Sequence, residues 1–483
     1  MTARHPSLWT PAELAEAVRG AASGSPPESL THQSLTGVSI DSRTVAAGEA
    51  FVALVGPNLD GHDYVGKALA SGAGLAIVAR RPADVAAGAP LVLVDDTQAA
   101  LERLGACART RAQARMTAVT GSVGKTSTKE ALAHCLARQG RTHWATGSFN
   151  NQWGVPLSLA RMPRDTEFGV FELGMNHAGE ICQLTAQVRP EVAIITTIEP
   201  AHLEYFSGIE AIADAKAEIF EGMAPGAAAI LNRDNAMFDR LAATARTRGL
   251  RIVAFGEHAE ADARLISVAL GAETSEVDAV FSGRRLAYRL GVPGKHLVLN
   301  SLAVLAAVQA LGADLDRAAD ALATLPGLAG RGRRVAIAVA QGSATLIDES
   351  YNASPAAMRA AFAVLAAARP AASGRRIAVV GDMRELGQEG PALHRALAEP
   401  LTESGVDRVY ACGPLMRHLY EALPERLRGA HRETAAELAP IVAEALRPGD
   451  VVTIKGSLGT RMADIVKPLL SGAASSQSQT PSC

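Results

Sequence analysis

The sequence predicts an α/β protein of three domains, in which a mostly parallel central sheet carries a phosphate-binding loop. Its 483 residues correspond to about three domains at roughly 150 residues each. Short apolar runs typical of buried strands alternate with helical patterns, as a parallel sheet requires. A glycine-rich turn at residues 120–126 joins one such run to a helical pattern, which is the usual context of a phosphate loop.

The apolar runs fall into three blocks. We expect domains at 1–112, 113–328 and 329–470, followed by a disordered Ser- and Gln-rich tail at 471–483. A stretch rich in Gly, Pro and Arg near 324–335 marks the second boundary. The expected strands are 37–45, 49–54, 75–79 and 90–96 in the first block, 168–174, 192–198, 227–232 and 250–256 in the second, and 344–350, 376–382, 407–413 and 450–457 in the third.

Composition excludes several classes of protein. The formal net charge is −2, without the basic excess typical of a nucleic-acid binder. The five cysteines are scattered and form no CxxC pair, which favours a reduced, cytoplasmic setting. The N-terminus lacks the apolar core of a secretion signal, and no apolar run approaches the ~18 residues of a membrane span. We therefore expect a cytoplasmic protein without a nucleic-acid partner or a membrane span.

The stretch TAVTGSVGKTSTKEAL at 117–132 is the strongest single motif. Gly121 and Gly124 let backbone N–H groups turn toward an anion, and the helix that follows adds its positive end. Lys125 would reach the β- and γ-phosphates, and the Thr126 hydroxyl would bind Mg²⁺. The usual template has a further glycine where Val119 stands, so a tight turn with a surface lysine is the alternative.

Two further side chains follow strands of the same block. Glu172 ends the run FGVFELG, and His202 follows VAIITTI. The carboxyl ends of parallel strands share one edge of a sheet, where ligands bind. Each residue alone could be a solvated acid or a loop histidine, but together with Thr126 they predict a Mg²⁺ site.

Lys216 interrupts an apolar helical stripe. Ile212 precedes it by four residues, and Ile219 and Phe220 follow it by three and four. A lysine at such a position is atypical. The alternative to a functional role is that its stem packs on the apolar face while the ammonium reaches water.

Eight motifs together resemble the Mur ligases of peptidoglycan synthesis. In chain order they are TGSVGKTSTKE, FNNQWGVPLSL, FELGMNHAGEI, EPAHLEYF, ADAKAEIF, DESYNASPAAM, GDMRELG and KGSLGTRM. They cover nearly the whole chain in the family's order, and the resemblance is closest to the last of the four ligases. The family has a short phosphate loop, [TS]-G-x-x-G-K-[TS], which fits Thr120–Thr126 and accounts for Val119.

The resemblance implies a fold and an activity. It implies a mixed α/β uridine-nucleotide domain, a central ATP domain and a Rossmann-like C-terminal domain. The implied enzyme is an ATP-dependent amide ligase that joins D-alanyl-D-alanine to UDP-MurNAc-tripeptide through an acyl phosphate. It would act as a cytoplasmic monomer with two Mg²⁺ ions and a carbamylated lysine at Lys216. The third residue of the tripeptide is not fixed by the sequence.

The resemblance also implies roles for individual residues. The implied catalytic residues are Lys125, Glu172, His202, Lys216 and Arg331. The implied nucleotide contacts are Gly121, Ser122, Gly124, Lys125, Thr126, Ser127, Asn300, Arg331 and Asp348. The implied metal ligands are Thr126, Glu172, His202 and Lys216. The implied substrate contacts are Ser42, Arg43, Asp60, Gly61, His62, Asn150, Asn151, Tyr351, Asn352 and Lys455.

One position departs from the family pattern, and three rival functions are weighed. The family has G-[KR]-H-N-x-x-N near the adenine, but Leu297 stands here in place of the first Asn. The diamino-acid-adding ligase is expected to carry a His in the motif at 351–355 and a DNPR sequence, both absent here. Folylpolyglutamate synthases lack the uridine domain. A phosphate-loop NTPase acting as a binding switch is the alternative from another class.

Overall fold

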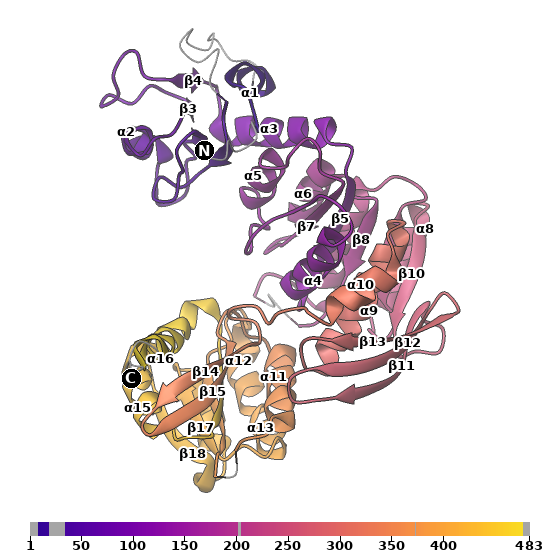
Figure 1. Cartoon of the computed structure of the whole chain (residues 1–483), viewed down its shortest axis with the longest axis vertical. Helices are drawn as coiled ribbons and strands as arrows, with labels where there is room; N and C mark the ends of the chain where they lie inside the picture. The colour runs from indigo at the N-terminus through magenta and orange to yellow at the C-terminus, as the bar shows by residue number, and fades with distance from the viewer. Residues whose placement is uncertain (1–7, 19–33, 201–203, 372, 477–483) are drawn as a thin grey trace, which may run out of the picture.

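The computed structural model describes residues 8–18, 34–200, 204–371 and 373–476. Three sheets follow one another along the chain, with four, nine and six strands. They are arranged as an arc in Figure 1, with the central unit between the other two. The predicted fold class, an α/β chain with a mostly parallel central sheet, is confirmed. The domain boundaries at 112 and 328 stay a prediction, although each predicted block holds one sheet.

The first sheet is parallel, in the order β1 (Gly37–Ser39), β2 (Glu49–Val52), β3 (Leu75–Val78) and β4 (Leu91–Leu93). Its helices are α1 (Pro11–Val18), α2 (Val65–Ala70) and α3 (Thr97–Arg111). Helix α3 shares an apolar core with helix α5 (Gly154–Ala160) of the central unit. The buried Trp9 indole donates to the carbonyl of Ala160 at 2.8 Å. The first unit is thus packed onto the central unit through an apolar contact.

The central sheet has the order β13-β12-β11-β10-β9-β8-β5-β7-β6. Its strands are β5 (Arg115–Thr120), β6 (Thr142–Trp144), β7 (Phe168–Glu172), β8 (Val192–Ile195), β9 (Ala228–Asn232), β10 (Arg251–Gly256), β11 (Ala263–Leu270), β12 (Ser275–Phe281) and β13 (Arg284–Leu290). All neighbours pair in parallel except β11–β12 and β12–β13. Strand β5 lies between β7 and β8, so the chain order reverses there, and ligands bind at such a point in open α/β sheets.

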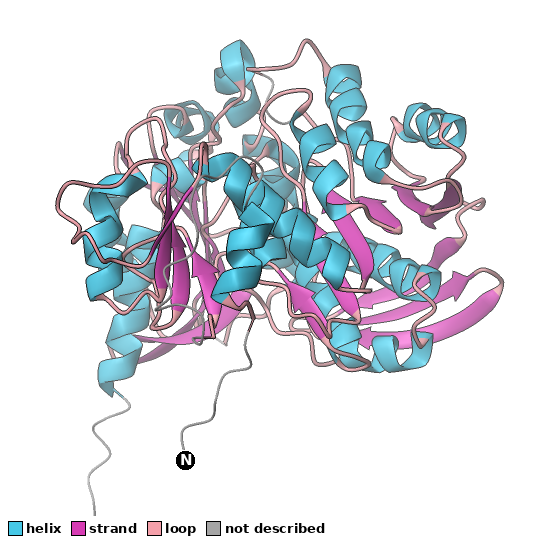
Figure 2. Ribbon diagram, turned by 90° about the horizontal axis from the view of Figure 1, so that it is seen from above, coloured by secondary structure: helices cyan, strands magenta, loops and turns pink. Residues whose placement is uncertain are grey.

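Helices cover both faces of this sheet, as Figure 2 shows. Helices α4 (Lys125–Ala137), α9 (Lys295–Ala310) and α10 (Leu315–Leu322) share a core with one face, which includes Val119. Helices α5, α6 (Glu180–Val188), α7 (Ile209–Ala217) and α8 (Phe238–Thr247) share a core with the other face, which includes Ala118. Consecutive residues of β5 thus face opposite layers, as strand geometry demands. The short helix η3 (Glu218–Gly222) follows α7.

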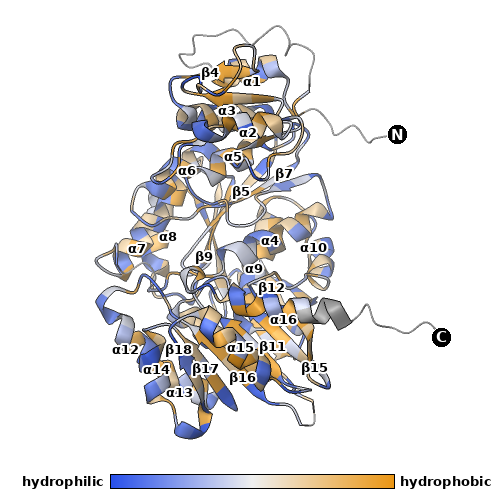
Figure 3. Ribbon diagram, turned by 90° about the vertical axis from the view of Figure 1, so that its left-hand side faces the viewer, coloured by the Kyte–Doolittle hydropathy of each residue, from blue (hydrophilic) through white to orange (hydrophobic). Residues whose placement is uncertain are grey.

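The third sheet has the order β14-β15-β19-β16-β17-β18, and only β14 (Arg333–Val339) is antiparallel to its neighbour. The others are β15 (Gly342–Glu349), β16 (Arg376–Gly381), β17 (Arg408–Cys412), β18 (Arg428–Arg432) and β19 (Val451–Lys455). Helices α11 (Pro355–Ala367), α12 (Gly390–Arg395), α13 (Ala398–Glu403) and α14 (Met416–Ala422) lie on one face, and α15 (Ala435–Ala445) and α16 (Ala463–Ser476) on the other. Much of this sheet is coloured hydrophobic in Figure 3.

The predicted start of the disordered tail, residue 471, falls within a helix, and the disorder itself stays a prediction. Helix α16 continues to Ser476, and the Ser471 hydroxyl donates to the carbonyl of Lys467 at 2.8 Å. The segment contains two alanines, which have the highest helix propensity, so an existing helix extends through it. Residues 477–483 lie outside the described residues.

Candidate active site

The glycine turn has the conformation of a phosphate loop. It runs from the end of β5 to helix α4, which begins at Lys125. Gly121 and Gly124 have φ angles of 140° and 88°, in the region that favours glycine. A Cβ atom on Gly124 would lie 2.7 Å from the amide nitrogen of Asn300. The loop therefore needs glycine for its backbone and for the close approach of α9.

Lys125 lies inside this loop, not on the surface as the alternative prediction would have it. Its ammonium donates to the carbonyls of Gly121 at 2.6 Å and Ser122 at 3.3 Å. Burial lowers the pKa of Lys125, and the positive charge of Arg331 lowers it further, whereas Glu172 opposes the shift. The cation is thus held over the loop with a second cation close enough to affect it.

An acidic oxygen cluster lies beside the loop. The buried Glu172, at the end of β7, accepts from the Thr126 hydroxyl and from the Asn150 amide, each at 2.7 Å. A hydroxyl and a carboxylate are the hard oxygen ligands that Mg²⁺ prefers, so this pair fits the ion. His202, the other predicted ligand, lies outside the described residues. Within the described residues, no group of three His, Cys, Asp or Glu side chains could hold a metal.

Lys216 is buried at the carboxyl end of α7, with 1% of its surface exposed. Its ammonium does not reach water, which rules out the alternative prediction for this residue. Burial lowers the pKa of Lys216 well below its ordinary value, and the charge of Lys125 lowers it further, against the attraction of Glu218. The ammonium of Lys125, on α4, therefore lies close enough to Lys216, on α7, to disfavour its charged form.

A pocket adjoins the start of α4. Its polar lining residues are Ser127, Glu130, Asn300, Ser301 and Arg331. The other lining residues are mainly apolar: Ala131, Leu290, Val292, Leu297, Leu325, Pro326 and Leu328. A mostly apolar pocket with a few polar groups suits a flat heterocycle attached to a charged chain. Leu297, the departure from the family pattern, lines this pocket.

Arg331 connects the second unit to the third. Its guanidinium lies 4.1 Å from the centre of the Tyr351 ring and donates to the Ser148 hydroxyl at 3.4 Å. Asp348 holds the same linker: its carboxylate accepts from the backbone N–H of Gly330 at 2.9 Å and from the Ser350 hydroxyl at 2.6 Å. Both oxygens of this buried acid are therefore engaged within the protein.

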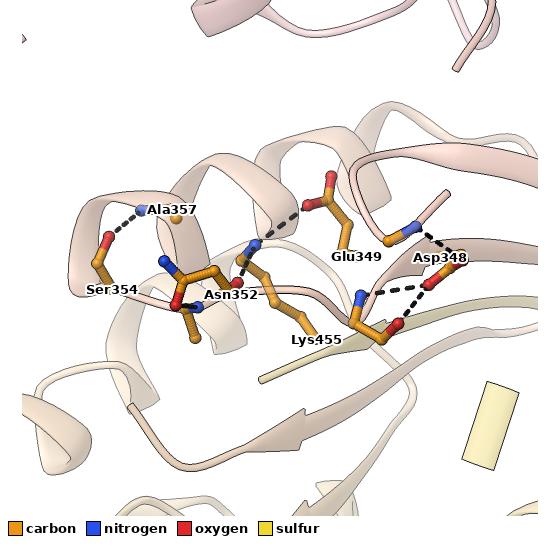
Figure 4. A network of polar contacts seen from close by, with 9 residues as sticks. Asp348, Glu349, Asn352, Ser354, Ala357 and Lys455 are labelled. Carbon is orange, nitrogen blue, oxygen red and sulfur yellow. Dashed lines mark hydrogen bonds and ion pairs between the residues drawn. The ribbon is translucent and has the colours of Figure 1, made fainter. Parts of the chain in front are cut away.

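Figure 4 shows the carboxyl edge of the third sheet. The ammonium of Lys455, at the end of β19, donates to Glu349 at 3.1 Å and to the carbonyl of Asn352 at 3.0 Å. Ser354 caps α11 by accepting from the N–H of Ala357 at 3.3 Å. Since both charges of the Lys455–Glu349 pair are largely buried, the pair fixes the 349–352 turn at this edge.

The predicted uridine contacts differ in their surroundings. Ser42 is buried, whereas the Arg43 side chain is 78% exposed and pairs with Asp41 at 2.7 Å. The buried His62 ring bridges two segments: Nδ1–H donates to Asp60 at 2.6 Å, and Nε2 accepts from the N–H of Ala79 at 2.9 Å. Hydrogen bonds from the His62 backbone and from Arg80 hold the pKa of Asp60 well below its usual range.

Gly61 lies where the chain passes very close to its own backbone. A Cβ atom there would lie 2.7 Å from the backbone nitrogen and oxygen of Leu54. The Gly61 N–H also donates to the Leu54 carbonyl at 2.7 Å. Gly61, Asp60 and His62 therefore shape this loop, and their fit to a uridine nucleotide stays a prediction.

Comparison with known families decides the classification. Residues 34–109 match the model described as Mur ligase family, catalytic domain; residues 119–308 match Mur ligase middle domain; and residues 330–458 match Mur ligase, glutamate ligase domain. A relative from Escherichia coli (strain K12), UDP-N-acetylmuramoyl-tripeptide--D-alanyl-D-alanine ligase, is 35% identical over 438 residues, which cover 90% of this chain and 94% of the relative. The chain belongs to the Mur ligase family.

Solved Mur ligases share this architecture across all three units. MurF from Acinetobacter baumannii matches with a TM-score of 0.81 and 31% identity, covering 95% of this chain and 98% of that one. MurF from Thermotoga maritima in complex with ADP matches with a TM-score of 0.73 and 26% identity, covering 91% and 98%. These matches confirm the predicted resemblance to the family.

The structure adds Mur ligase residues that the sequence analysis missed. Ser148 meets Arg331, Glu349 meets Lys455, and the buried Lys129 of α4 donates to carbonyls of the segment before Asn150. Lys129 follows Lys125 by four residues within an apolar stripe of α4, and this spacing could have indicated it. In the described part of this Mur ligase, no helix is long and apolar enough to cross a membrane.

Proposed function

We propose that this Mur ligase joins D-alanyl-D-alanine to UDP-MurNAc-tripeptide at the expense of ATP, as a cytoplasmic monomer in the synthesis of peptidoglycan precursors. The observation that carries the proposal is the 35% identity to a ligase of that name over 90% of the chain. The aligned region includes the first unit of the chain, which folylpolyglutamate synthases lack. A chain that only hydrolysed nucleotide would need neither the first unit nor the third.

The central site suits a nucleoside triphosphate. The adenine would occupy the apolar pocket beside Leu297 and Asn300, and the phosphates would lie over Gly121, Ser122 and Gly124. Ser127 lies on the helix between the two. Asp348 would act near the ribose by holding the linker that closes this side.

The chemistry required of the protein is positioning and charge neutralisation. A carboxylate is a poor acylating agent, so the tripeptide carboxylate first attacks the γ-phosphate of ATP, which releases ADP and gives an acyl phosphate. The amine of the dipeptide then attacks that carbonyl carbon and loses a proton, and phosphate leaves. Lys125 and Arg331 offset the negative charge on the transferred group, as in other phosphoryl transfers.

Thr126 and Glu172 would hold Mg²⁺, with His202 as a further ligand. The ion neutralises phosphate charge when bound. Lys216 would become a ligand for a second Mg²⁺ after modification. Its neutral amine, favoured by burial, adds to carbon dioxide to give a carbamate and a proton. The charge is thereby reversed and two oxygens are presented to the metal site.

The two other substrates would approach from the outer units. Ser42, Arg43 and the 60–62 loop would contact the uridine nucleotide. Asn150 and Asn151, on the loop beside Glu172, would contact its peptide. Tyr351, Asn352 and Lys455, at the carboxyl edge of the third sheet, would contact the dipeptide.

A competition for the incoming amine tests the proposal. The purified protein is supplied with ATP, Mg²⁺ and either UDP-MurNAc-tripeptide or UDP-MurNAc-dipeptide, and with radiolabelled D-alanyl-D-alanine, diaminopimelate or lysine as the incoming amine. We expect label in the product only with D-alanyl-D-alanine. Incorporation of diaminopimelate or lysine onto a UDP-MurNAc-dipeptide would assign the chain to the diamino-acid-adding ligase instead.

A further inference from the structure

Lys129 is a buried cation that the mechanism above does not use. It lies on α4, four residues after Lys125, with none of its side chain exposed. Its ammonium donates to the carbonyls of Ala145 at 2.5 Å and Gly147 at 2.9 Å, and pairs with Glu130 at 2.7 Å. An ammonium has three N–H donors, so these three oxygens satisfy it completely.

The segment that Lys129 holds, residues 145–151, carries two groups of the active site. The Ser148 hydroxyl accepts from Arg331 at 3.4 Å, and the Asn150 amide donates to Glu172 at 2.7 Å. Glu172 in turn accepts from Thr126. Lys129 is thus connected through this segment to both groups: through Asn150 to Glu172, and through Ser148 to Arg331.

A second contact ties the start of this segment to the same helix. The Trp144 indole donates to Glu130 at 3.1 Å, through the carboxylate oxygen that does not pair with Lys129. Two neighbouring residues of α4, Lys129 and Glu130, therefore hold residues 144–147 by hydrogen bonds. The helix that follows the phosphate loop thus also positions the loop that carries Asn150.

The chemical type of Lys129 is unusual for its place. Burying an ammonium is strongly unfavourable unless it is paired and hydrogen-bonded. The stripe around it on α4 is apolar, with Leu132, Ala133 and Leu136 buried. An apolar residue would fill the space without that cost, but it would leave the carbonyls of Ala145 and Gly147 without this donor.

We propose that Lys129 is a positioning residue for phosphoryl transfer: it anchors residues 145–151 so that Asn150 orients Glu172 and Ser148 meets Arg331. The inference rests on the proposed function for its chemistry and on the contacts above for its geometry. The Lys129 ammonium contacts Ala145, Gly147 and Glu130, none of which is a proposed metal ligand, so we assign its effect to the Asn150 and Ser148 side chains of the segment that it holds.

The test compares Lys129→Met with wild type. Methionine keeps an unbranched chain of similar length but removes all three donors. The affinity for Mn²⁺ in the presence of ADP, measured by electron paramagnetic resonance, reports the carboxylate site without turnover. Loss of a partner that orients a metal ligand weakens metal affinity by about 10- to 100-fold. We expect a loss at the lower end of that range, with kcat reduced by a similar factor.

His134→Leu is the matched control. His134 also lies on α4, and its Nε2 donates to the carbonyl of Ala321 at 2.9 Å, away from residues 145–151. It should lower the thermal midpoint while leaving Mn²⁺ affinity and kcat at wild-type values. If Lys129→Met behaves in the same way, Lys129 only stabilises the fold and the proposal is overturned.

A double variant with Asn150→Ala tests whether Lys129 affects the metal site through Asn150. If Lys129 acts mainly through Asn150, Lys129→Met should add little to the loss of Mn²⁺ affinity already caused by Asn150→Ala. Fully additive losses would contradict the proposal. Lys129→Gln, which keeps one amide group, replaces the methionine variant should that fail to fold, with a smaller loss expected. A wild-type protein without ligase activity that still binds Mn²⁺–ADP would refute the proposed function alone.

Discussion

At the scale of single residues, charge placement dominates this site. Two lysines come from different elements: Lys216 is buried and Lys125 is half-buried, and the positive charge of Lys125 lowers the pKa of Lys216. Glu172 is the nearby acid whose charge opposes the shift at Lys125. Cations placed in this way can offset the negative charge of phosphate groups bound among them.

Replacing Lys125 with alanine removes one of these charges. We expect Lys125→Ala to abolish acyl-phosphate formation, because the lysine offsets charge on the transferred phosphate. The fold should persist, since the hydrogen bonds of the Lys125 ammonium within the described residues go to two carbonyls of its own loop, those of Gly121 and Ser122. Single-turnover measurement of ADP formation, beside circular dichroism, checks both parts. A folded variant with near-normal ligation would remove Lys125 from the mechanism.

Substitutions of Lys216 test whether it acts as a positive charge or as a carbamate. Lys216→Arg keeps a positive charge but cannot become a carboxylate-like ligand, so we expect it to be inactive. Lys216→Ala should regain part of its activity when acetate or formate fills the vacated space. Activity assays across a series of carboxylic acids measure this. Full activity of Lys216→Arg, or no response of Lys216→Ala to any acid, would contradict carbamylation.

His143 gives stability a dependence on pH. Its Nε2–H donates to the carbonyl of Ser158 at 2.8 Å, and burial lowers the pKa of His143 from its ordinary 6.5 to about 4. Between these values the unfolded chain binds the proton that the folded chain refuses, so stability falls as the pH falls. In His143→Gln this fall between pH 6.5 and 4 should be smaller than in wild type, as measured by urea unfolding. Equal falls would show that His143 is not the source.

At the scale of elements, the sequence predicted the buried parallel strands well. Every predicted strand is present, because runs such as VAIITTI are apolar on both faces, as central parallel strands are. Strands β6, β11, β12, β13 and β14 were missed. In the edge strand β13, Arg284, Arg285 and Arg289 are exposed, so its overall polarity resembled that of a loop. Strand β18, RGAHR, has no apolar pattern at all.

The candidate site was predicted in part, for a related physical reason. Strand ends at one edge bring Thr126, Glu172 and the phosphate loop together, and periodicity placed Lys216 on a buried face. Contacts made by loops leave no periodic pattern of apolar residues in the sequence. The bonds of Asn150 to Glu172 and of Ser148 to Arg331 depend on how a turn folds back, which the sequence alone does not fix.

The linker between the second and third sheets is expected to act in turnover. Arg331 stacks on Tyr351 and reaches Ser148. We expect Arg331→Ala to lower kcat by about 10²-fold while nucleotide affinity changes little, because its charge is needed when the phosphate is transferred. Stopped-flow nucleotide binding and steady-state kinetics separate the two effects. Arg334→Ala, at the start of β14 and under the electrostatic influence of Glu273, is the matched control. Wild-type turnover in Arg331→Ala would remove the role.

At the scale of the whole molecule, the three units meet the demands of one reaction with three substrates. The first unit is fixed to the central one through α3, α5 and Trp9. The third is joined to it by the linker that carries Arg331, and it presents Lys455 and Asn352 at the carboxyl edge of its sheet. Phosphate chemistry at the central sheet is useful only when both outer units hold their substrates.

The central claim is that this chain couples ATP cleavage to the joining of two peptides. The most direct measurement is steady-state phosphate release with ATP and Mg²⁺, alone and with UDP-MurNAc-tripeptide, D-alanyl-D-alanine or both. We expect sustained release only with both, matched one for one by the UDP-MurNAc-pentapeptide product. Sustained release from ATP alone, or release that the dipeptide does not increase, would contradict the claim and favour a nucleotide-hydrolysing switch.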